Sequence, residues 1–403
     1  MSAGELEDIA TPVEPAEVWA RVKQLRNSGR AVEAIPLLEV LCARHPSDFR
    51  YALCVAELLV DRGRLGDAAR FLDQARRIGA PDPKTAEVLD RLGLHHTLLL
   101  LEQARRHGEL IETYHRTVGR TPSTVRKIEE WSPIVNRAGQ ALWREAGGRV
   151  GAQAASIIAE VRERGLAIRS FADIIGDMGL FADLQTVMRT TTDWTVPGKP
   201  HFFKAMAEEA ASVWHPVMKA GLNPAMLEIA NGFYGLFSRL VSANIVLTKT
   251  DTGVGRSRQG SEGWHRDPED TPMFKAFIYL NDVLEIGHGP FQYVPASRPG
   301  GRYEFLMPRF GRGIYDPSYK TKPDWDQADQ EIAPSDVITV LGRAGTMFFA
   351  DTSAFHRGGY CTAQDRYMAA YVYQRPASQF PSYIKATPDP EATLAARMAL
   401  WAP

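Results

Sequence analysis

The stretch GWHRDPEDTPMFKAFIYLND, residues 263–282, carries a candidate metal site at the start of a predicted strand. His265 and Asp267 are two residues apart, and side chains at this spacing in extended backbone point to the same side. One imidazole and one carboxylate can therefore bind a single metal ion and leave coordination positions open. The same spacing also arises by chance on protein surfaces, so the pattern needs a partner elsewhere in the chain.

That partner is the stretch FFADTSAFHRGGY, residues 348–360, in which His356 lies 89 residues after Asp267. Arg366 follows ten residues later, on the next predicted strand. An arginine there can form a bidentate pair with the distal carboxylate of 2-oxoglutarate while the 2-oxo acid end chelates iron. The order of His-x-Asp, His and Arg therefore predicts a metal centre with a bound 2-oxo acid.

Residues 244–376 resemble the phytanoyl-CoA dioxygenase family of iron(II)/2-oxoglutarate oxygenases. The resemblance includes FIYLND followed by GPFQYVPAS, and HRGG with a trailing arginine. It implies that His265, Asp267 and His356 bind Fe(II), that Arg366 anchors 2-oxoglutarate, and that O2 is the second co-substrate. It also implies a double-stranded β-helix, the jelly-roll core of the cupin-like folds.

The sequence departs from the family at two places. Residues 296–298 read Ala-Ser-Arg where the family often has Gly-Ser-His, and Gly358 stands where a hydroxyl side chain often assists the co-substrate. A second contact to the co-substrate is therefore expected elsewhere, and Lys275 or Thr248 is the candidate. Lys275 shares one strand face with Tyr279, for which a half-buried structural role is as reasonable.

Asp267 also bears on the reaction, because halogenating relatives have a small residue at this position. Halogenation is therefore disfavoured, and hydroxylation of an unactivated C–H bond with release of succinate and CO2 is the expected outcome. Desaturation, demethylation and ring formation use the same ligands, so the sequence does not separate them.

The texture of the chain predicts an α+β protein. Residues 121–240 form a mostly helical connector that contains one short strand in GLAIRSF, and short β-branched and aromatic runs follow after Asn244. We therefore expect an oxygenase core over residues 241–385 and a tail over 386–403.

Residues 1–120 contain an internal repeat. SGRAVEAIPLLEVLCARHP from Ser28 is echoed 34 residues later by RGRLGDAARFLDQARRIGAP from Arg62, and a weaker third unit is expected near Gly108. This period resembles a tetratricopeptide array of stacked helix pairs with a groove, which implies a protein partner. A generic helical bundle is the alternative interpretation.

Composition sets the outer limits. Lys plus Arg number 47 against 48 Asp plus Glu, so no global charge favours nucleic acid or an anionic membrane. Three cysteines without paired spacing give neither a disulfide framework nor a cysteine metal site, and no run of 18 apolar residues occurs. A cytoplasmic protein without nucleic-acid or membrane partners is expected.

The other histidines are interpreted as structural, and His288 in the IGHGP turn is the one to watch. This group consists of His95, His96, His201, His215 and His288. Residues 298–336 are too polar and too long for a plain turn, and look like a lid or specificity loop. The arginines at 298, 302, 309 and 312 are candidates for contact with an anionic substrate, although a solvated basic loop is the better-supported interpretation.

Two classes of function fit these patterns. The first is an oxygenase that acts on a small metabolite, and the second is an oxygenase-like domain whose helical repeats chiefly recruit a protein. In an intermediate version the repeats present a peptide or carrier-bound substrate to the metal. The complete set of three ligands favours the first.

Overall fold

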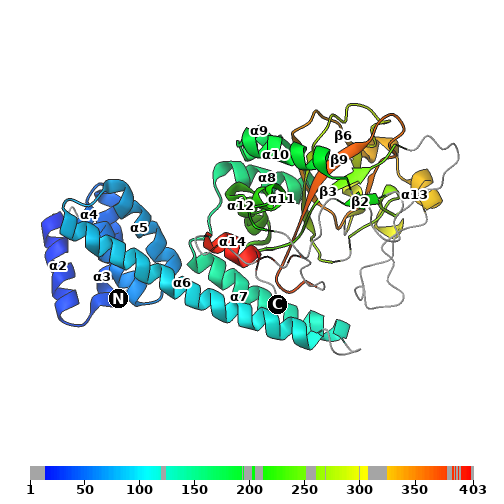
Figure 1. The fold of residues 1–403 in the computed structure, drawn as a ribbon. Coiled ribbons are helices and arrows are strands. Elements are labelled where there is room, and N and C mark those ends of the chain that lie inside the picture. The colour runs from blue at the N-terminus through cyan, green and yellow to red at the C-terminus, as the bar shows by residue number, and fades with distance from the viewer. Residues whose placement is uncertain are drawn as a thin grey trace. The chain divides into compact units, whose positions relative to one another are not determined.

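A computed structural model describes residues 14–118, 124–192, 194, 202–204, 212–250, 260–267, 269–298, 300–306, 325–378, 384, 386, 389 and 392–400. The chain divides into two compact units (Figure 1). The first comprises Met1–Arg106 and Ala141–Gly148, and the second comprises His107–Gln140 and Arg149–Pro403.

The first unit begins with two helix hairpins that repeat with the predicted period. Helices α2 (Pro15–Asn27) and α3 (Ala31–Arg44) form the first, and α4 (Phe49–Asp61) and α5 (Leu65–Ile78) form the second. Each bound of the second hairpin lies 34 residues after the matching bound of the first. The hairpins turn at Gly29 (φ 76°) and Gly63 (φ 68°), which have a left-handed backbone that glycine adopts without strain.

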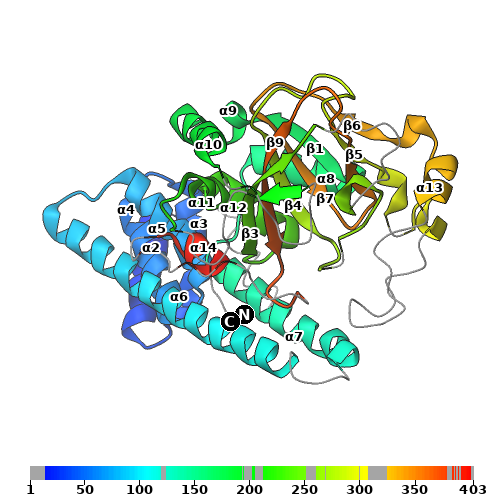
Figure 2. The ribbon, with the colours of Figure 1, turned by 45° about the vertical axis from the view of Figure 1, so that its right-hand side comes forward.

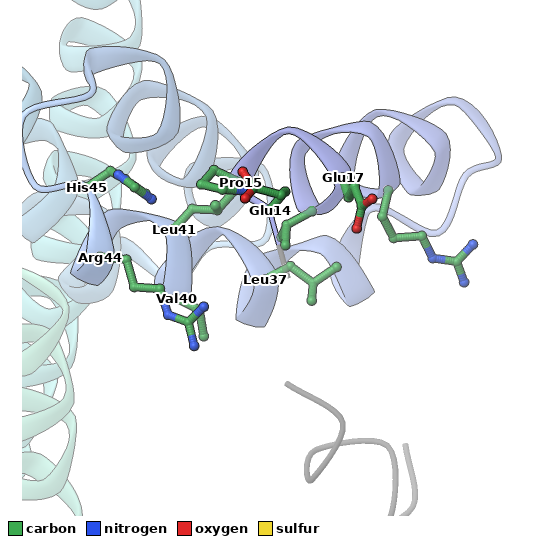
Figure 3. A pocket seen from close by; sticks show the side chains of 10 residues that line it. Glu14, Pro15, Glu17, Leu37, Val40, Leu41, Arg44 and His45 are labelled. Atoms are coloured by element: carbon green, nitrogen blue, oxygen red, sulfur yellow. The ribbon is translucent and has the colours of Figure 1, made fainter. Parts of the chain in front are cut away.

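A cavity of about 350 Å³ lies between α2 and α3 in the first unit (Figure 3). Leu37, Val40 and Leu41 of α3 form its apolar wall. Glu14 and Glu17 bring negative charge to its edge, where Arg44 and His45 also lie. The hairpins therefore leave an amphipathic hollow beside their buried core.

Two long helices follow, α6 (Pro83–Val118) and α7 (Thr124–Glu145). The predicted third repeat near Gly108 is wrong as a helix pair, because Gly108 lies inside the uninterrupted α6. A single glycine lowers helix stability by only about 1 kcal/mol, which tertiary packing readily offsets. Among the described residues, no helix is long and apolar enough to cross a membrane.

The second unit places short helices beside two antiparallel sheets (Figure 2). The helices are α8 (Ala152–Arg164), α9 (Phe171–Ile174), α10 (Met178–Thr190), α11 (Pro216–Gly221), α12 (Pro224–Tyr234), α13 (Trp325–Glu331) and α14 (Leu394–Ala399). Local chemistry starts several of them. In α12, for example, the Asn223 side chain accepts from the Ala225 N–H, and Pro224 occupies the first turn.

The larger sheet has six strands in the order β1-β7-β4-β9-β3-β2, and the smaller has the order β6-β5-β8. The larger sheet contains β1 (Leu166–Ser170), β2 (Phe202–Lys204), β3 (Arg239–Thr248), β4 (Phe274–Tyr279), β7 (Thr346–Asp351) and β9 (Arg366–Gln374). The smaller contains β5 (Phe291–Tyr293), β6 (Ile338–Val340) and β8 (His356–Gly358). The short strand predicted in GLAIRSF is β1, which pairs with β7.

The strands of the larger sheet bury different cores on their two faces. Phe274, Ala276 and Ile278 of β4 pack in one cluster with residues of α8, α10, α11 and α12. Phe277 and Tyr279 pack in another with residues of the smaller sheet, including Phe291. We call the second face the inner face, because it lies toward the smaller sheet. This alternation turns Lys275 toward the inner face as well.

Candidate metal centre

His265, Asp267 and His356 lie together in the second unit, with their ligand atoms within 4.8 Å of one another. His356 begins β8, and His265 pairs with it through two backbone hydrogen bonds of 3.1 and 3.0 Å. The Asp267 N–H donates to the Thr352 carbonyl oxygen at 3.0 Å. Backbone pairing therefore holds the two sequence segments in register and brings the three side chains to one point.

Both histidines contact a backbone carbonyl oxygen through the same ring nitrogen. Nδ1 of His265 lies 3.0 Å from the Gly263 carbonyl oxygen, and Nδ1 of His356 lies 3.1 Å from that of Ala354. A carbonyl oxygen only accepts, so Nδ1 carries the proton in both rings, and Nε2 is the nitrogen with the electron pair that binding of a metal requires. This is the arrangement in which histidine ligands are commonly oriented in metalloproteins.

Burial and neighbouring charges keep His356 and Asp267 in their metal-binding protonation states. Burial, together with the charge of His265, lowers the pKa of His356 to about 3. Burial raises the pKa of Asp267, but Lys275 and the two histidines lower it by more. The pKa of this carboxyl therefore lies well below its usual range. At neutral pH the pocket thus contains a neutral imidazole beside a carboxylate.

The donor set fits a metal cation. His356 Nε2 lies 3.3 Å from Asp267 Oδ2, so two electron-pair donors face each other across a short gap. Two ligand atoms about 2.1 Å from one metal and at right angles to each other would lie about 3.0 Å apart, close to this separation. Two histidines and one carboxylate are the facial donor set typical of non-haem iron(II) sites.

Lys275 lies against this set, because its Nζ is 2.7 Å from Asp267 Oδ2. Burial lowers the pKa of Lys275, but Asp267 and Glu269 raise it by more, so the ammonium stays charged. The same burial, with repulsion from Asp267, raises the pKa of the Glu269 carboxyl. The structure therefore brings Lys275 to a predicted metal ligand, and its contact with a co-substrate remains a prediction.

Arg366 and Thr248 meet on neighbouring strands of the inner face. They are register partners in the β3–β9 pair, and Arg366 Nη2 donates to Thr248 Oγ1 at 2.9 Å. Nη1 donates to the Gly289 carbonyl oxygen, and Nε has no hydrogen-bond partner among the described residues. Gly358 leaves the space for this side chain, since a Cβ atom there would lie 2.8 Å from Arg366 Nη2.

A contact that the sequence did not reveal joins the residues next to the two histidines. Trp264 Nε1 and Arg357 Nη1 both donate to Asp329 Oδ1 of α13, each at 3.0 Å. The Arg357 guanidinium also stacks over the Trp264 ring, 4.1 Å from its centroid. Asp329 thus ties the two histidine-bearing segments together. In the sequence, the only indication of this contact is that Trp264 and Arg357 each stand next to a predicted histidine ligand.

Several of the other predicted candidates have structural partners. Arg298 donates to the carbonyl oxygens of Arg162 and Glu163, and Arg302 pairs with Asp336. Arg309 and Arg312 lie outside the described residues, as does His201. Of the other histidines, His95 is exposed, His96 contacts the Leu65 carbonyl oxygen, His215 caps α11 and His288 contacts the Leu284 N–H.

No model of a known protein family matches the sequence. A comparison with curated proteins finds no match either.

Solved structures give weak matches. The epimerase SnoN from nogalamycin biosynthesis, described as non-haem and α-ketoglutarate dependent, shares 19% identity over 55% of this chain and 83% of its own, with a TM-score of 0.37. HygX from Streptomyces hygroscopicus, with nickel and 2-oxoglutarate bound, shares 15% identity over 57% of this chain and 89% of its own, with a TM-score of 0.38. EctD from S. alaskensis shares 17% identity over 59% of this chain and 82% of its own, with a TM-score of 0.38. Similarity at this level carries no conclusion about what this chain binds or catalyses.

Proposed function

We propose that this chain is an Fe(II)- and 2-oxoglutarate-dependent oxygenase. The observation that carries the proposal is the facial set of His265, Asp267 and His356, in which each histidine uses Nδ1 for a backbone contact and keeps Nε2 for the metal. Metal, 2-oxoglutarate and O2 together supply the oxidation of a C–H bond with release of succinate and CO2. The protein around them is proposed to have a double-stranded β-helix core of the phytanoyl-CoA dioxygenase type.

The proposed tasks of the chain follow from its contacts. Arg366, held by Thr248 and the Gly289 carbonyl oxygen, binds the distal carboxylate of 2-oxoglutarate. Lys275 contacts Oδ2 of Asp267, the same oxygen that faces His356 Nε2, and so holds the carboxylate toward the histidines. Trp264 and Arg357, fixed by Asp329, keep the two histidines at a constant separation.

The substrate is proposed to be a small molecule, or a group carried on a peptide or carrier protein, and hydroxylation is the expected reaction. Two helix hairpins with a 34-residue period and an amphipathic hollow favour a tetratricopeptide-like role in recruiting a protein. A peptide or protein hydroxylase, or a recruiting scaffold with an oxygenase-like domain, is therefore the second candidate function.

The test is anaerobic titration of the purified protein with Fe(II) and then with 2-oxoglutarate. We expect one bound Fe(II) and a visible metal-to-ligand charge-transfer band when the 2-oxo acid chelates the metal. His356→Ala should remove the band and weaken metal binding by at least about 100-fold, because one of three ligands is lost. His95→Ala, at an exposed position, is the matched control. Unchanged iron affinity in His356→Ala would rule out the ligand set.

A further inference from the structure

Arg239, the first residue of β3, is a buried cation without a charge partner among the described residues. Arg239 is 2% exposed, and its Nε and Nη2 atoms have no hydrogen-bond partner among the described residues. No carboxylate of the described chain lies within ion-pair distance. Burial alone lowers the pKa of Arg239 to about 10, so the guanidinium is still charged at neutral pH.

The one described polar contact of Arg239 does not compensate this charge. Its Nη1 lies 3.3 Å from Nε2 of His115 in α6, and the same Nε2 lies 2.9 Å from the Pro376 carbonyl oxygen. Burial and the charge of Arg239 lower the pKa of His115 to about 4, so this imidazole is neutral. A buried, unpaired charge is costly, and proteins usually pair such a group with a counter-ion.

Strand register places Arg239 on the inner face, at the other end of the β3–β9 pair from Arg366. Arg239 pairs with Gln374, whereas Thr248 pairs with Arg366. Alternate residues of β9 share a face, so Arg366 and Gln374 point to the same side, and Arg239 does as well. Two buried arginines without a carboxylate partner among the described residues therefore lie at opposite ends of one face.

The level of the candidate metal centre lies between these ends. Val372 of β9 pairs with Lys275 on one side and with Ser242 on the other, and Lys275 touches Asp267. If 2-oxoglutarate extends from the metal to Arg366, as proposed above, the opposite direction along this face is left for a second substrate. Arg239 lies on that side. Its partner Gln374 is two residues beyond Val372 on β9, and the register of β3 shifts between Leu240 and Ser242.

We propose that Arg239 binds an anionic group of the primary substrate, a carboxylate or a phosphate, and so makes this an oxygenase for anionic substrates. That the bound group belongs to a substrate rests on the proposed function. That the group is anionic rests on the unpaired guanidinium of Arg239. An oxyanion would accept hydrogen bonds from Nε and Nη2 together, which is the bidentate geometry that arginine offers.

The first test is thermal unfolding of the metal-free protein in inorganic phosphate or acetate, with chloride as reference at the same ionic strength. One of the two anions should raise the wild-type Tm by about 3 °C or more at saturation: phosphate if the substrate group is a phosphate, acetate if it is a carboxylate. Arg239→Met should lose this rise, while Arg366→Met should keep part of it. Equal shifts in wild type and Arg239→Met, or no shift with either anion, would overturn the proposal.

The second test separates a binding role from a packing role. Replacing an unpaired buried charge by an apolar side chain of similar length is neutral or stabilising, so Arg239→Met without added anion should have a Tm equal to or above that of the wild type. Arg375→Met is the control, because Arg375 is paired with Asp270 and its loss leaves a carboxylate unpaired. A Tm of Arg239→Met that falls as far as that of Arg375→Met would assign Arg239 to the core instead.

A third measurement separates this inference from the proposed function. Arg239→Met should bind Fe(II) and 2-oxoglutarate like the wild type, but lose stimulation of succinate formation by carboxylated or phosphorylated compounds. Absence of the charge-transfer band in the wild type would reject the oxygenase while leaving the anion test intact. Equal stimulation of wild type and Arg239→Met by the same anionic compounds would reject the substrate assignment.

Discussion

Lys275 shows how one side chain can hold a proposed metal ligand in place. Its ammonium lies 2.7 Å from one oxygen of Asp267 in a buried position, where charge–charge attraction is stronger than in water. The interaction keeps Asp267 ionised and fixes the orientation of its carboxylate. A lysine at this place on β4 therefore contributes to the geometry of the proposed iron site, whether or not it also meets the co-substrate.

For Arg366 the expectation is a loss of co-substrate affinity. Removal of a buried arginine leaves the distal carboxylate of 2-oxoglutarate unpaired, at a cost of about 2–5 kcal/mol. Arg366→Ala should therefore raise the 2-oxoglutarate concentration for half-saturation at least about tenfold, as measured by titration of the charge-transfer band. Thr248→Val should have a smaller effect, because it removes one hydrogen bond to the guanidinium, worth about 1 kcal/mol. An unchanged titration in Arg366→Ala would move the anchor to Lys275 or Arg375.

Among the secondary-structure elements, α6 combines an exposed stretch with a buried stretch that contains an unusual histidine. His107 is 4% exposed, and neither ring nitrogen has a hydrogen-bond partner among the described residues. It lies against Gly139 of α7, where a Cβ atom would come within 3.1 Å of Nε2. Burial lowers the pKa of His107 to about 4, so the packed helix pair holds this imidazole in its neutral form.

This histidine should make folding sensitive to acid. Its pKa is lower in the folded state than the value of about 6.5 in an unfolded chain, so the unfolded state takes up the proton first as the pH falls. The stability is complete above about pH 6.5 and is lost progressively down to about pH 4. At pH 5 the loss from His107 is about 2 kcal/mol.

His107→Leu should remove this part of the pH dependence, measured as the difference in unfolding free energy between pH 7.5 and pH 5 in denaturant titrations. Between pH 7.5 and pH 5 the variant should lose about 2 kcal/mol less unfolding free energy than the wild type. His95→Leu, at an exposed position of the same helix, should leave the difference unchanged. An identical pH dependence in wild type and His107→Leu would show that His107 is not held neutral by folding.

At the scale of the whole molecule, the division into units runs through α6 and not at its end. Ile111 and Tyr114 of α6 pack with Val135 and Ala377, and the Tyr114 hydroxyl donates to the Ala377 carbonyl oxygen at 3.2 Å. The second half of α6 therefore belongs to the second unit. The domain border that the sequence suggested near residue 120 lies after this half of α6, between it and the residues Val135 and Ala377 that it packs against.

Two truncated chains should behave differently for this reason. A chain that starts at His107 keeps the α6 contacts and should remain soluble and bind Fe(II). A chain that starts at Thr121 exposes the apolar cluster around Ala377 and should aggregate. Soluble yield and Fe(II) binding measure both outcomes. Equal behaviour of the two chains would show that the second half of α6 adds nothing to the second unit.

The longer of the two truncated chains also tests the role of the helix hairpins. If they recruit a carrier or protein substrate, this chain should still form succinate slowly without substrate, but lose turnover coupled to the carrier-bound substrate. Full coupled turnover would leave the repeats without a role in this reaction.

The sequence by itself determined the local patterns of this protein. A spacing of two residues in extended backbone fixes that His265 and Asp267 point to one side, and the distant His356 and Arg366 follow in the expected order. The 34-residue period likewise predicted both helix hairpins, because each turn requires a glycine at a left-handed position. Such features depend on neighbours along the chain.

Only the tertiary structure decided which charges are compensated. The pairing of β3 with β9 takes Arg239 to Gln374 and away from any described carboxylate, whereas Arg375 meets Asp270. Packing of α13 brings Asp329 to the residues beside both histidines, and burial in α6 holds His107 neutral. These outcomes follow from strand register and from the low polarity of the interior, which join segments far apart in the sequence, so no local pattern could contain them.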